Sequence, residues 1–367
     1  MVVHGRLIIH VQLSRQGPVF SLRNNTIRQF IATAQCQGGT TEAQNCQDQL
    51  DAERDGASAS DFETYLQGPQ KGSAPRREKK LPAVQRTALE ILDVAKRNWI
   101  GQIDDMFSDS EVIDKHIMTI VANRKRLEDI MDAANYLQAK RVSDCRIYTW
   151  DKIRNTISDS ATFGYPVMMS RDDSLAILKW LFRRNFPDYT DKILSLKPWF
   201  DMKSKKNTIL MLGPPSCGKS WFGTALSKLG CYIGTILNYS KGSSFCFGNT
   251  TNCRVIVHDE CQWPLVTEYT EVLKMLYGGQ STPVDVKYKN KQTGGNCPVV
   301  AMANCHPCKD PKLIAPMQTR CDEWHFIYSM DELKFQTDVP HVTGPCHPLA
   351  IFDLYDYIES NEYMDSE

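Results

Sequence analysis

The sequence has no apolar run long enough to cross a membrane, and its opening residues lack the pattern of a secretion signal. No charge of one sign prevails either: the formal net charge is zero, so any surface that binds nucleic acid has to be local. What remains is an ordinary balance of 42% apolar and 23% charged residues over 367 positions. We therefore expect a protein without a membrane segment that is long enough for two or three domains.

A second pair of cysteines at zinc-finger spacing is also missing. The chain has 13 cysteines, but they are scattered, and we interpret them as reduced thiols in the cytosol or nucleus. The tightest group is Cys305, His306 and Cys308 in "NCHPC". A zinc site at Cys305 and Cys308 stays open, although two thiols without another pair leave a tetrahedral ligand set incomplete. The alternative is a pair of buried thiols on a loop.

The pattern of the chain changes along its length. Residues 1–80 join one strand-like segment, "GRLIIHVQLS", to polar and basic stretches, which predicts a partly disordered region. Residues 81–200 carry apolar residues at helical spacing and predict a helical domain. Residues 201–330 alternate strand-like with helix-like segments, which predicts an α/β domain with a mostly parallel sheet. Residues 331–367 end in "IFDLYDYIESNEYMDSE", with six acids and no base, and predict an exposed acidic tail or a terminal helix.

A glycine-rich loop lies within the α/β region. The segment "GPPSCGKS" follows the apolar "NTILML" and precedes the helix-like "WFGTALSKLG". Strand, loop and helix in this order place backbone N–H groups and a helix N-terminus around a phosphate. We expect Lys219 to be exposed and to reach the outer phosphates, and the Ser220 hydroxyl to hold magnesium. The predicted ATP-binding residues are Gly213, Pro214, Pro215, Ser216, Cys217, Gly218, Lys219 and Ser220.

Two further predicted strands end in polar side chains. The segment "RVIVHDE" ends in Asp259 and Glu260, and "CPVVAMAN" ends in Asn304. Magnesium on a triphosphate needs a carboxylate at the same sheet edge as the loop, and Asp259 fits that role. The neighbouring Glu260 can orient or deprotonate the attacking water, and the Asn304 amide can position that water against the terminal phosphate.

A basic hairpin is predicted between these two strands. Lys287, Lys289 and Lys291 alternate in "VDVKYKNKQTGG", so on a hairpin they would share one face. Three lysines on one face can bind the backbone of a nucleic acid. The alternative is a solvated edge strand whose lysines prevent edge-to-edge pairing.

Together, "GPPSCGKS", "VIVHDE", "LKMLYGGQSTPVDVKYKNK" and "VVAMANCHP" resemble the superfamily 3 helicases. More narrowly, they resemble the helicase half of the large non-structural replication protein of parvoviruses, in particular of insect densoviruses. The resemblance covers about residues 145–330. It implies an AAA+ core behind a helical oligomerisation bundle, ATP and Mg²⁺ as cofactors, and unwinding of single-stranded or forked DNA. It also implies a homo-oligomeric ring, typically a hexamer, in the host nucleus, with the cytoplasm as the alternative.

The resemblance implies roles for individual residues as well. Asp259 and Glu260 would handle magnesium and water, and Asn304 would sense the terminal phosphate. Lys287 and Lys289 would line the DNA channel. Arg320, in "PMQTRCDEWHF", would act as an arginine finger on the ATP of the neighbouring subunit. The alternative for Arg320 is a surface ion pair with the acidic side chains that follow it, Asp322 or Glu323, which would contribute little.

Parvovirus proteins of this kind carry a nicking endonuclease before the helicase, with a His-hydrophobe-His motif and a Tyr-x-x-x-Lys motif. This chain has His10 and Gln12 in "IIHVQL", and Tyr65 followed by a lysine at a looser spacing. Tyr136 and Lys140 have the right spacing but lie in the helical region. We therefore expect residues 1–80 to be a truncated or degenerate nuclease region.

The leading hypothesis is an ATP-dependent DNA helicase that drives replication of a small single-stranded DNA virus genome. A phosphate-loop kinase, or another nucleotide-binding protein without helicase activity, remains an alternative. A kinase usually needs a lid and an acceptor site, which the basic hairpin and Asn304 do not suit. An inactive relic of an endogenised viral gene is the second alternative, although the intact motif residues argue against decay of the ATPase core.

Overall fold

A computed structural model describes residues 82–101, 112, 124–240, 245–263, 266–287, 290–308 and 310–365. The predictions made for residues 1–80, including His10, Gln12 and Tyr65, lie outside the described residues. Residues 87–367 form one compact unit, which is described here by itself. No helix in the described part of the chain is long and apolar enough to cross a membrane.

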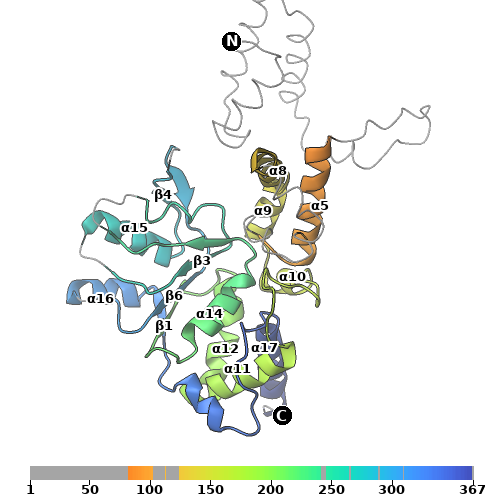
Figure 1. Cartoon of the computed structure of the whole chain (residues 1–367). Helices are drawn as coiled ribbons and strands as arrows, with labels where there is room; N and C mark the ends of the chain where they lie inside the picture. The colour runs from red at the N-terminus through yellow and green to blue at the C-terminus, as the bar shows by residue number, and fades with distance from the viewer. Residues whose placement is uncertain are drawn as a thin grey trace, which may run out of the picture. The chain divides into compact units, whose positions relative to one another are not determined.

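Five parallel strands form the central sheet, in the order β2-β3-β6-β1-β7 (Figure 1). Strand β1 lies between β6 and β7, and Leu212 at its carboxyl end is in register with Ala303 of β6 and His325 of β7. The carboxyl ends of these strands therefore open on one edge of the sheet. This confirms the predicted α/β fold with a mostly parallel sheet. The strands are β1 Thr208–Leu212, β2 Ile233–Thr235, β3 Val255–His258, β6 Val299–Ala303 and β7 Cys321–His325.

Helices cover both faces of the sheet, which explains why β1 and β6 are buried along their whole length. On one face, Ile209 and Met211 of β1 pack in a core with α14 (Lys219–Lys228). On the other face, Leu210 and Leu212 pack in a second core with α15 (Thr267–Tyr277) and with Met317 of α16 (Pro311–Gln318). The alternation follows from the two-residue period of a strand.

The helices before the sheet begin and end at ordinary helix signals. Ser170 caps α11 by accepting a hydrogen bond from the Asp173 N–H, and α11 ends at Asn185, two residues before Pro187. The other helices of this region are α5 Ala83–Arg97, α8 Arg124–Leu137, α9 Ala139–Arg146, α10 Trp150–Arg154, α12 Tyr189–Leu194 and α13 Leu196–Phe200; α11 spans Arg171–Asn185.

The domain boundary expected at residue 200 does not separate two cores in the structure. Phe182 of α11 and Phe200 of α13 belong to the same buried cluster as Met211 of β1. Phe182 makes edge contacts with Phe222 of α14 and Trp324 of β7, with ring centroids 4.9 and 5.8 Å apart. Helices α10 to α13 are therefore part of the α/β core rather than of a separate helical domain.

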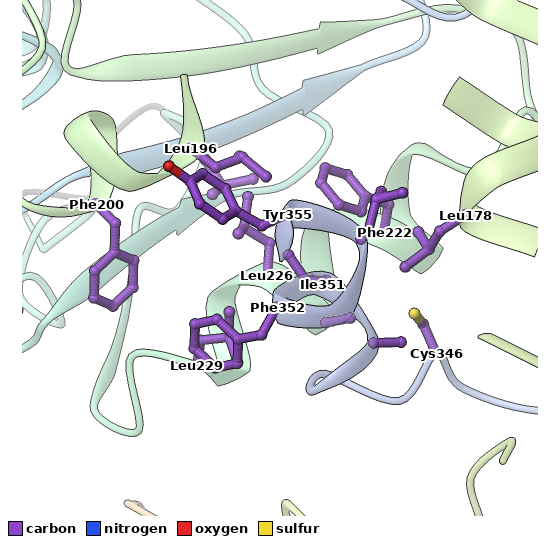
Figure 2. Packing of buried hydrophobic residues seen from close by; sticks show 14 of the residues in the cluster. Leu178, Leu196, Phe200, Phe222, Leu226, Leu229, Cys346, Ile351, Phe352 and Tyr355 are labelled. Atoms are coloured by element: carbon purple, nitrogen blue, oxygen red, sulfur yellow. The ribbon is translucent and has the colours of Figure 1, made fainter. Parts of the chain in front are cut away.

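The acidic C-terminal segment is a helix, which is one of the two structures predicted for it. Helix α17 (Ala350–Asp365) follows the short 3-10 helix η2 (Met330–Phe335) and packs on α11 and α12. Two of its acids face basic partners, since Asp353 pairs with Arg171 and Asp356 with Arg154. Figure 2 shows the apolar side of α17 enclosed by side chains of other elements. The buried residues of α17 are Ala350, Ile351, Phe352, Leu354, Tyr355 and Ile358.

The predicted hairpin exists, but Lys287 and Lys291 do not lie on its strands. Strand β4 (Thr282–Val284) pairs with β5 (Gln292–Gly294), with Thr282 opposite Gly294. Lys287 and Lys291 belong to the connection between the two strands, and Lys289 lies outside the described residues. The expectation of one shared strand face was therefore wrong, because the paired segments are only three residues long.

Phe352→Ala should lower the free energy of unfolding of the full chain by about 3–5 kcal/mol, the usual cost of deleting a buried aromatic ring. Phe352 is 2% exposed, and its ring meets Trp150 at 4.6 Å between centroids. The matched control is Phe335→Ala, because Phe335 is 85% exposed and should change stability by less than about 0.5 kcal/mol. Urea unfolding of both variants measures these changes in the free energy of unfolding. Equal changes would show that the packing of α17 does not stabilise the fold.

Candidate functional site

The glycine-rich loop lies between β1 and α14, as predicted, and its glycines are required by the backbone. Gly213 approaches Phe326 so closely that a Cβ atom would lie 2.1 Å from the Phe326 carbonyl oxygen. Gly218 caps α14 with φ of 90°, a left-handed conformation that side chains disfavour. The Ser216 carbonyl accepts a hydrogen bond from the Met330 N–H at 2.8 Å, which ties the loop to η2.

Lys219 is buried, not exposed as expected. Only 6% of the residue is accessible, because its Nζ turns back into the loop. It donates hydrogen bonds to the Gly213 carbonyl at 2.7 Å and the Pro214 carbonyl at 2.8 Å. It also lies 3.3 Å from the Asn304 Oδ1. A buried ammonium needs such partners, and phosphate oxygens could replace the two carbonyls.

The acidic pair follows β3 directly, and Asn304 follows β6. The Asn304 Nδ2 donates to the Glu260 carboxylate, at 3.2 Å to Oε2. Since Asn304 Oδ1 faces Lys219, one amide joins the loop lysine to the acidic turn. The Asp259 side chain accepts a hydrogen bond from the Glu260 N–H at 3.0 Å. The structure thus brings together three side chains that the sequence places on three different segments.

A cavity of about 480 Å³ opens beside this row. Its volume lies in the range of small-molecule sites, roughly 300–1,000 Å³. Part of its wall was not predicted, since it is formed by residues of η2 and of the segment that follows η2. No sequence motif distinguishes those residues. They reach the cavity only because the chain after β7 folds back beside the loop. The lining residues from this wall are Met330, Asp331, Leu333, Lys334, His341 and Val342.

The possible metal ligands are two oxygen-bearing side chains, of which only Ser220 lines the cavity, and two thiols. Ser220 and Asp259 are exposed at the start of α14 and the end of β3. Within the described residues, no group of three or more His, Cys, Asp or Glu side chains could hold a metal ion. Cys305 is exposed, whereas Cys308 is buried and its thiol donates to the Asp310 carbonyl. The two thiols therefore do not form a zinc site by themselves.

Arg320 lies far from the loop of its own chain. It immediately precedes β7, beside the start of β1, and five strand residues of roughly 3.3 Å each separate that end from the loop. Its Nε donates to the Lys274 carbonyl at 3.0 Å, and another guanidinium nitrogen donates to the Pro316 carbonyl. The alternative pairing with Asp322 or Glu323 is not what the structure shows, since Asp322 contacts Lys192, and Glu323 lies nearest His306 and His325.

The lysines of the hairpin connection are on the surface. Lys287 and Lys291 are exposed, and the Lys291 Nζ lies 3.7 Å from the Asp285 carboxylate. An exposed pair at that distance contributes little and is easily exchanged for another anion. Neither lysine lies among the residues that line the cavity.

A buried histidine precedes the acidic pair. Burial lowers the pKa of His258 from 6.5 to about 3, so the imidazole is neutral at physiological pH. Its Nδ1 lies 2.9 Å from the Tyr277 hydroxyl, and its Nε2 lies 3.0 Å from the Asn238 Oδ1. No pattern in the sequence distinguished His258, Asn238 or Tyr277.

With this geometry in place, comparison with known proteins decides the family. A profile of papillomavirus helicases matches residues 127–338, which is more than half of the chain. The chain belongs to the papillomavirus helicase family. The matched span runs from α8 to just after η2, so it includes the loop, the acidic turn, Asn304, the hairpin and Arg320.

Relatives of this helicase include proteins of two virus groups. Replication protein E1 of European elk papillomavirus is 26% identical over 195 residues, which cover 52% of this chain and 31% of E1. Initiator protein NS1 of human parvovirus B19 is 32% identical over 139 residues, which cover 38% of this chain and 20% of NS1. NS1 of Bombyx mori densovirus is 31% identical over 100 residues, which cover 27% of this chain and 11% of that NS1. The chain thus spans about a third or less of the length of these relatives, which confirm its resemblance to viral replication helicases.

JCV helicase is one of the solved structures that match this chain. It shares 14% identity with this chain, with a TM-score of 0.45, and the match covers 77% of this chain and 92% of JCV helicase.

The neutral state of His258 predicts a pH dependence of stability. Because the folded pKa of His258 is depressed to about 3, the unfolded chain binds an extra proton between that value and 6.5. The contribution of neutral His258 to the free energy of unfolding is therefore present above pH 6.5. It is lost as the pH falls below that value, by up to about 1.4 kcal/mol per pH unit. Urea unfolding between pH 4 and 7 should show that the free energy of unfolding falls less with decreasing pH in His258→Gln than in the wild type. Parallel pH profiles would contradict a buried neutral His258.

Proposed function

We propose that this protein is an ATP-driven DNA helicase that acts in replication of a small single-stranded DNA virus genome. The observation that carries the proposal is the row of Lys219, Asn304 and Glu260 beside a cavity of about 480 Å³. Membership of the papillomavirus helicase family and the names of the relatives, replication protein E1 and initiator protein NS1, support it.

The phosphates of ATP would lie in the loop at the N-terminus of α14. There they would meet backbone N–H groups, the positive end of the helix and the Lys219 ammonium. An ammonium has three donors, so Lys219 can bind a phosphate oxygen and still donate to Asn304. The apolar side chains of Met330 and Val342 in the other part of the wall offer a surface for the base.

Ser220 and Asp259 would hold magnesium. Both supply the oxygen ligands that Mg²⁺ prefers, and Mg²⁺ typically takes only one or two protein ligands beside phosphates and water. The absence of a three-ligand cluster among the described residues is compatible with this small share. When bound, the ion would neutralise charge on the terminal phosphates as the bond to the leaving group breaks.

Glu260 would act on the attacking water. It is exposed beside the cavity, and its carboxylate is oriented by the Asn304 amide. A carboxylate so held can accept the proton of a water, while Asn304 and Lys219 keep the terminal phosphate in line with it. The same amide therefore links the group that binds phosphate to the group that handles water.

The hairpin connection would contact DNA. Lys287 and Lys291 project positive charge from a surface segment, so they can bind backbone phosphates without reading the base sequence. The two lysines would bind from the connection between β4 and β5, not from one face of a strand.

Glu260→Gln should retain nucleotide binding but lower kcat for ATP hydrolysis at least about 100-fold, because it removes a general base with little change of shape. The matched control, Glu268→Gln, alters an exposed acid in the first turn of α15 and should leave turnover unchanged. Phosphate release and nucleotide affinity are measured with and without single-stranded DNA. Hydrolysis in the wild type that DNA does not stimulate would favour the phosphate-loop kinase or another nucleotide-binding function, and no hydrolysis would favour the inactive relic.

A ring assembly, with six subunits as the expected number, would give Arg320 a function that its own chain cannot. Since Arg320 lies at the opposite end of β1 from the loop, it can reach only the ATP of another subunit. Its present carbonyl partners hold the guanidinium at the end of α16, where it is only partly buried. A guanidinium placed there can donate twice to the charge that develops on phosphate.

Mixing Arg320→Ala with Lys219→Ala subunits should restore part of the ATPase activity that each variant lacks. Some boundaries in mixed rings then combine an intact Arg320 with an intact loop. The control mixture, Lys219→Ala with Glu260→Gln, should not recover, because both changes damage the same cavity. ATPase activity is measured after mass analysis has shown that the rings are mixed. Equal failure of both mixtures would leave Arg320 with a local structural role.

A further inference from the structure

The acidic turn has an unusual backbone conformation. Glu260 has φ of 46°, in the left-handed region, which residues with a side chain seldom occupy. A residue held in that region is strained, and it persists only where neighbouring groups enforce the conformation. In this conformation the Glu260 carboxylate meets the Asn304 amide. The groups that hold the turn therefore determine where the proposed general base points.

Asn238 holds the turn at its strained residue, Glu260, and two residues beyond it. It lies three residues after the end of β2, and its Nδ2 donates to the Glu260 carbonyl at 2.8 Å. Its Oδ1 accepts a hydrogen bond from the Gln262 N–H at 3.0 Å. Between these two contacts the Cys261 N–H donates to the Met302 carbonyl at 2.8 Å. Asn238 is thus a side-chain clamp across residues 260–262.

His258 fixes the orientation of this clamp. Because Asn238 Oδ1 is an acceptor, the His258 Nε2 beside it must carry the proton. The other ring nitrogen, Nδ1, is then an acceptor, and the Tyr277 hydroxyl 2.9 Å away donates to it. Each of the two hydrogen bonds that link Tyr277 to His258 and His258 to Asn238 then pairs one donor with one acceptor. A flipped Asn238 would bring its NH₂ group against both the His258 Nε2–H and the Gln262 N–H.

We propose that Asn238 and His258 are positioning residues for Glu260. The His258 imidazole, protonated on Nε2, orients the Asn238 amide, and that amide holds the acidic turn. The proposal rests on the proposed ATPase function and deepens it. Neither residue lies among those that line the cavity, so they would act on catalysis only through Glu260. They should affect the rate of the chemical step and leave nucleotide binding alone.

Two changes at position 258 separate the hydrogen bond from the packing. His258→Met keeps an unbranched side chain of similar bulk but has no donor for Asn238. His258→Gln can still present an amide N–H near the place of Nε2. We expect kcat for ATP hydrolysis to fall about 10- to 100-fold in His258→Met, the size of effect that a displaced catalytic group produces, with KM for ATP changed less than about twofold. His258→Gln should recover a large part of that loss.

Asn238→Asp tests the clamp itself, because it removes the donor to the Glu260 carbonyl with little change of shape. The matched control is Asn249→Asp, since Asn249 is also placed beside the end of β2, where its amide contacts Thr235 and not the acidic turn. Asn238→Asp should lower kcat as His258→Met does, and Asn249→Asp should not. If His258→Met fails to fold, Tyr277→Phe provides the second variant, because it removes only the hydroxyl that donates to His258.

The decisive measurement is made in the Glu260→Gln background. If Asn238 and His258 act through Glu260, their substitutions should lower the residual kcat of that variant no further, whereas a general loss of structure would lower it again. A wild type that hydrolyses ATP, with kcat unchanged in Asn238→Asp and His258→Met, would overturn the positioning role alone. A wild type that does not hydrolyse ATP would overturn the proposed function and the positioning role with it.

Discussion

The Asn304 amide is the interaction on which the site depends. One of its atoms faces the Lys219 ammonium at 3.3 Å and the other donates to Glu260 at 3.2 Å. That bridge is geometrically available only because β6 lies between β1 and β3 in the sheet, with all three strands parallel. Loop, amide and acidic turn then follow three neighbouring strands at one edge. An antiparallel strand at this place would send one of the three side chains to the opposite edge.

The second wall of the cavity depends on packing that is remote from the loop. The chain leaves β7, forms η2 against the loop, and returns to α17, whose apolar side is enclosed by α11, α12 and α14 (Figure 2). The contacts that hold this return include the Met330 N–H to the Ser216 carbonyl and the Trp221 indole to the Gly344 carbonyl at 2.9 Å. Burial of α17 therefore helps to position one wall of the cavity and also contributes to stability.

The groups that support the acidic turn show how a polar network can be buried without charge. Every cysteine in the described part of the chain is a free thiol, and all of them except Cys305 are buried. In the same interior, His258 is held neutral by burial and finds a partner for each ring nitrogen. A charged imidazole there would lack a compensating anion, which explains why its pKa is so low.

The sequence by itself determined the parts of the site that follow from local chemistry. A strand that leads through two glycines into a helix specifies the loop at Gly213–Ser220, and buried strands that end in Asp259, Glu260 and Asn304 specify polar groups at one sheet edge. Tertiary structure decided whatever depends on contacts between distant segments. It buried Lys219, moved the hairpin lysines off the strands, packed α10 to α13 into the core and brought residues 330–342 to the cavity. The reason is physical: propensity and periodicity act over a few residues, whereas burial and hydrogen-bond partners are set by segments that meet only when the sheet has formed.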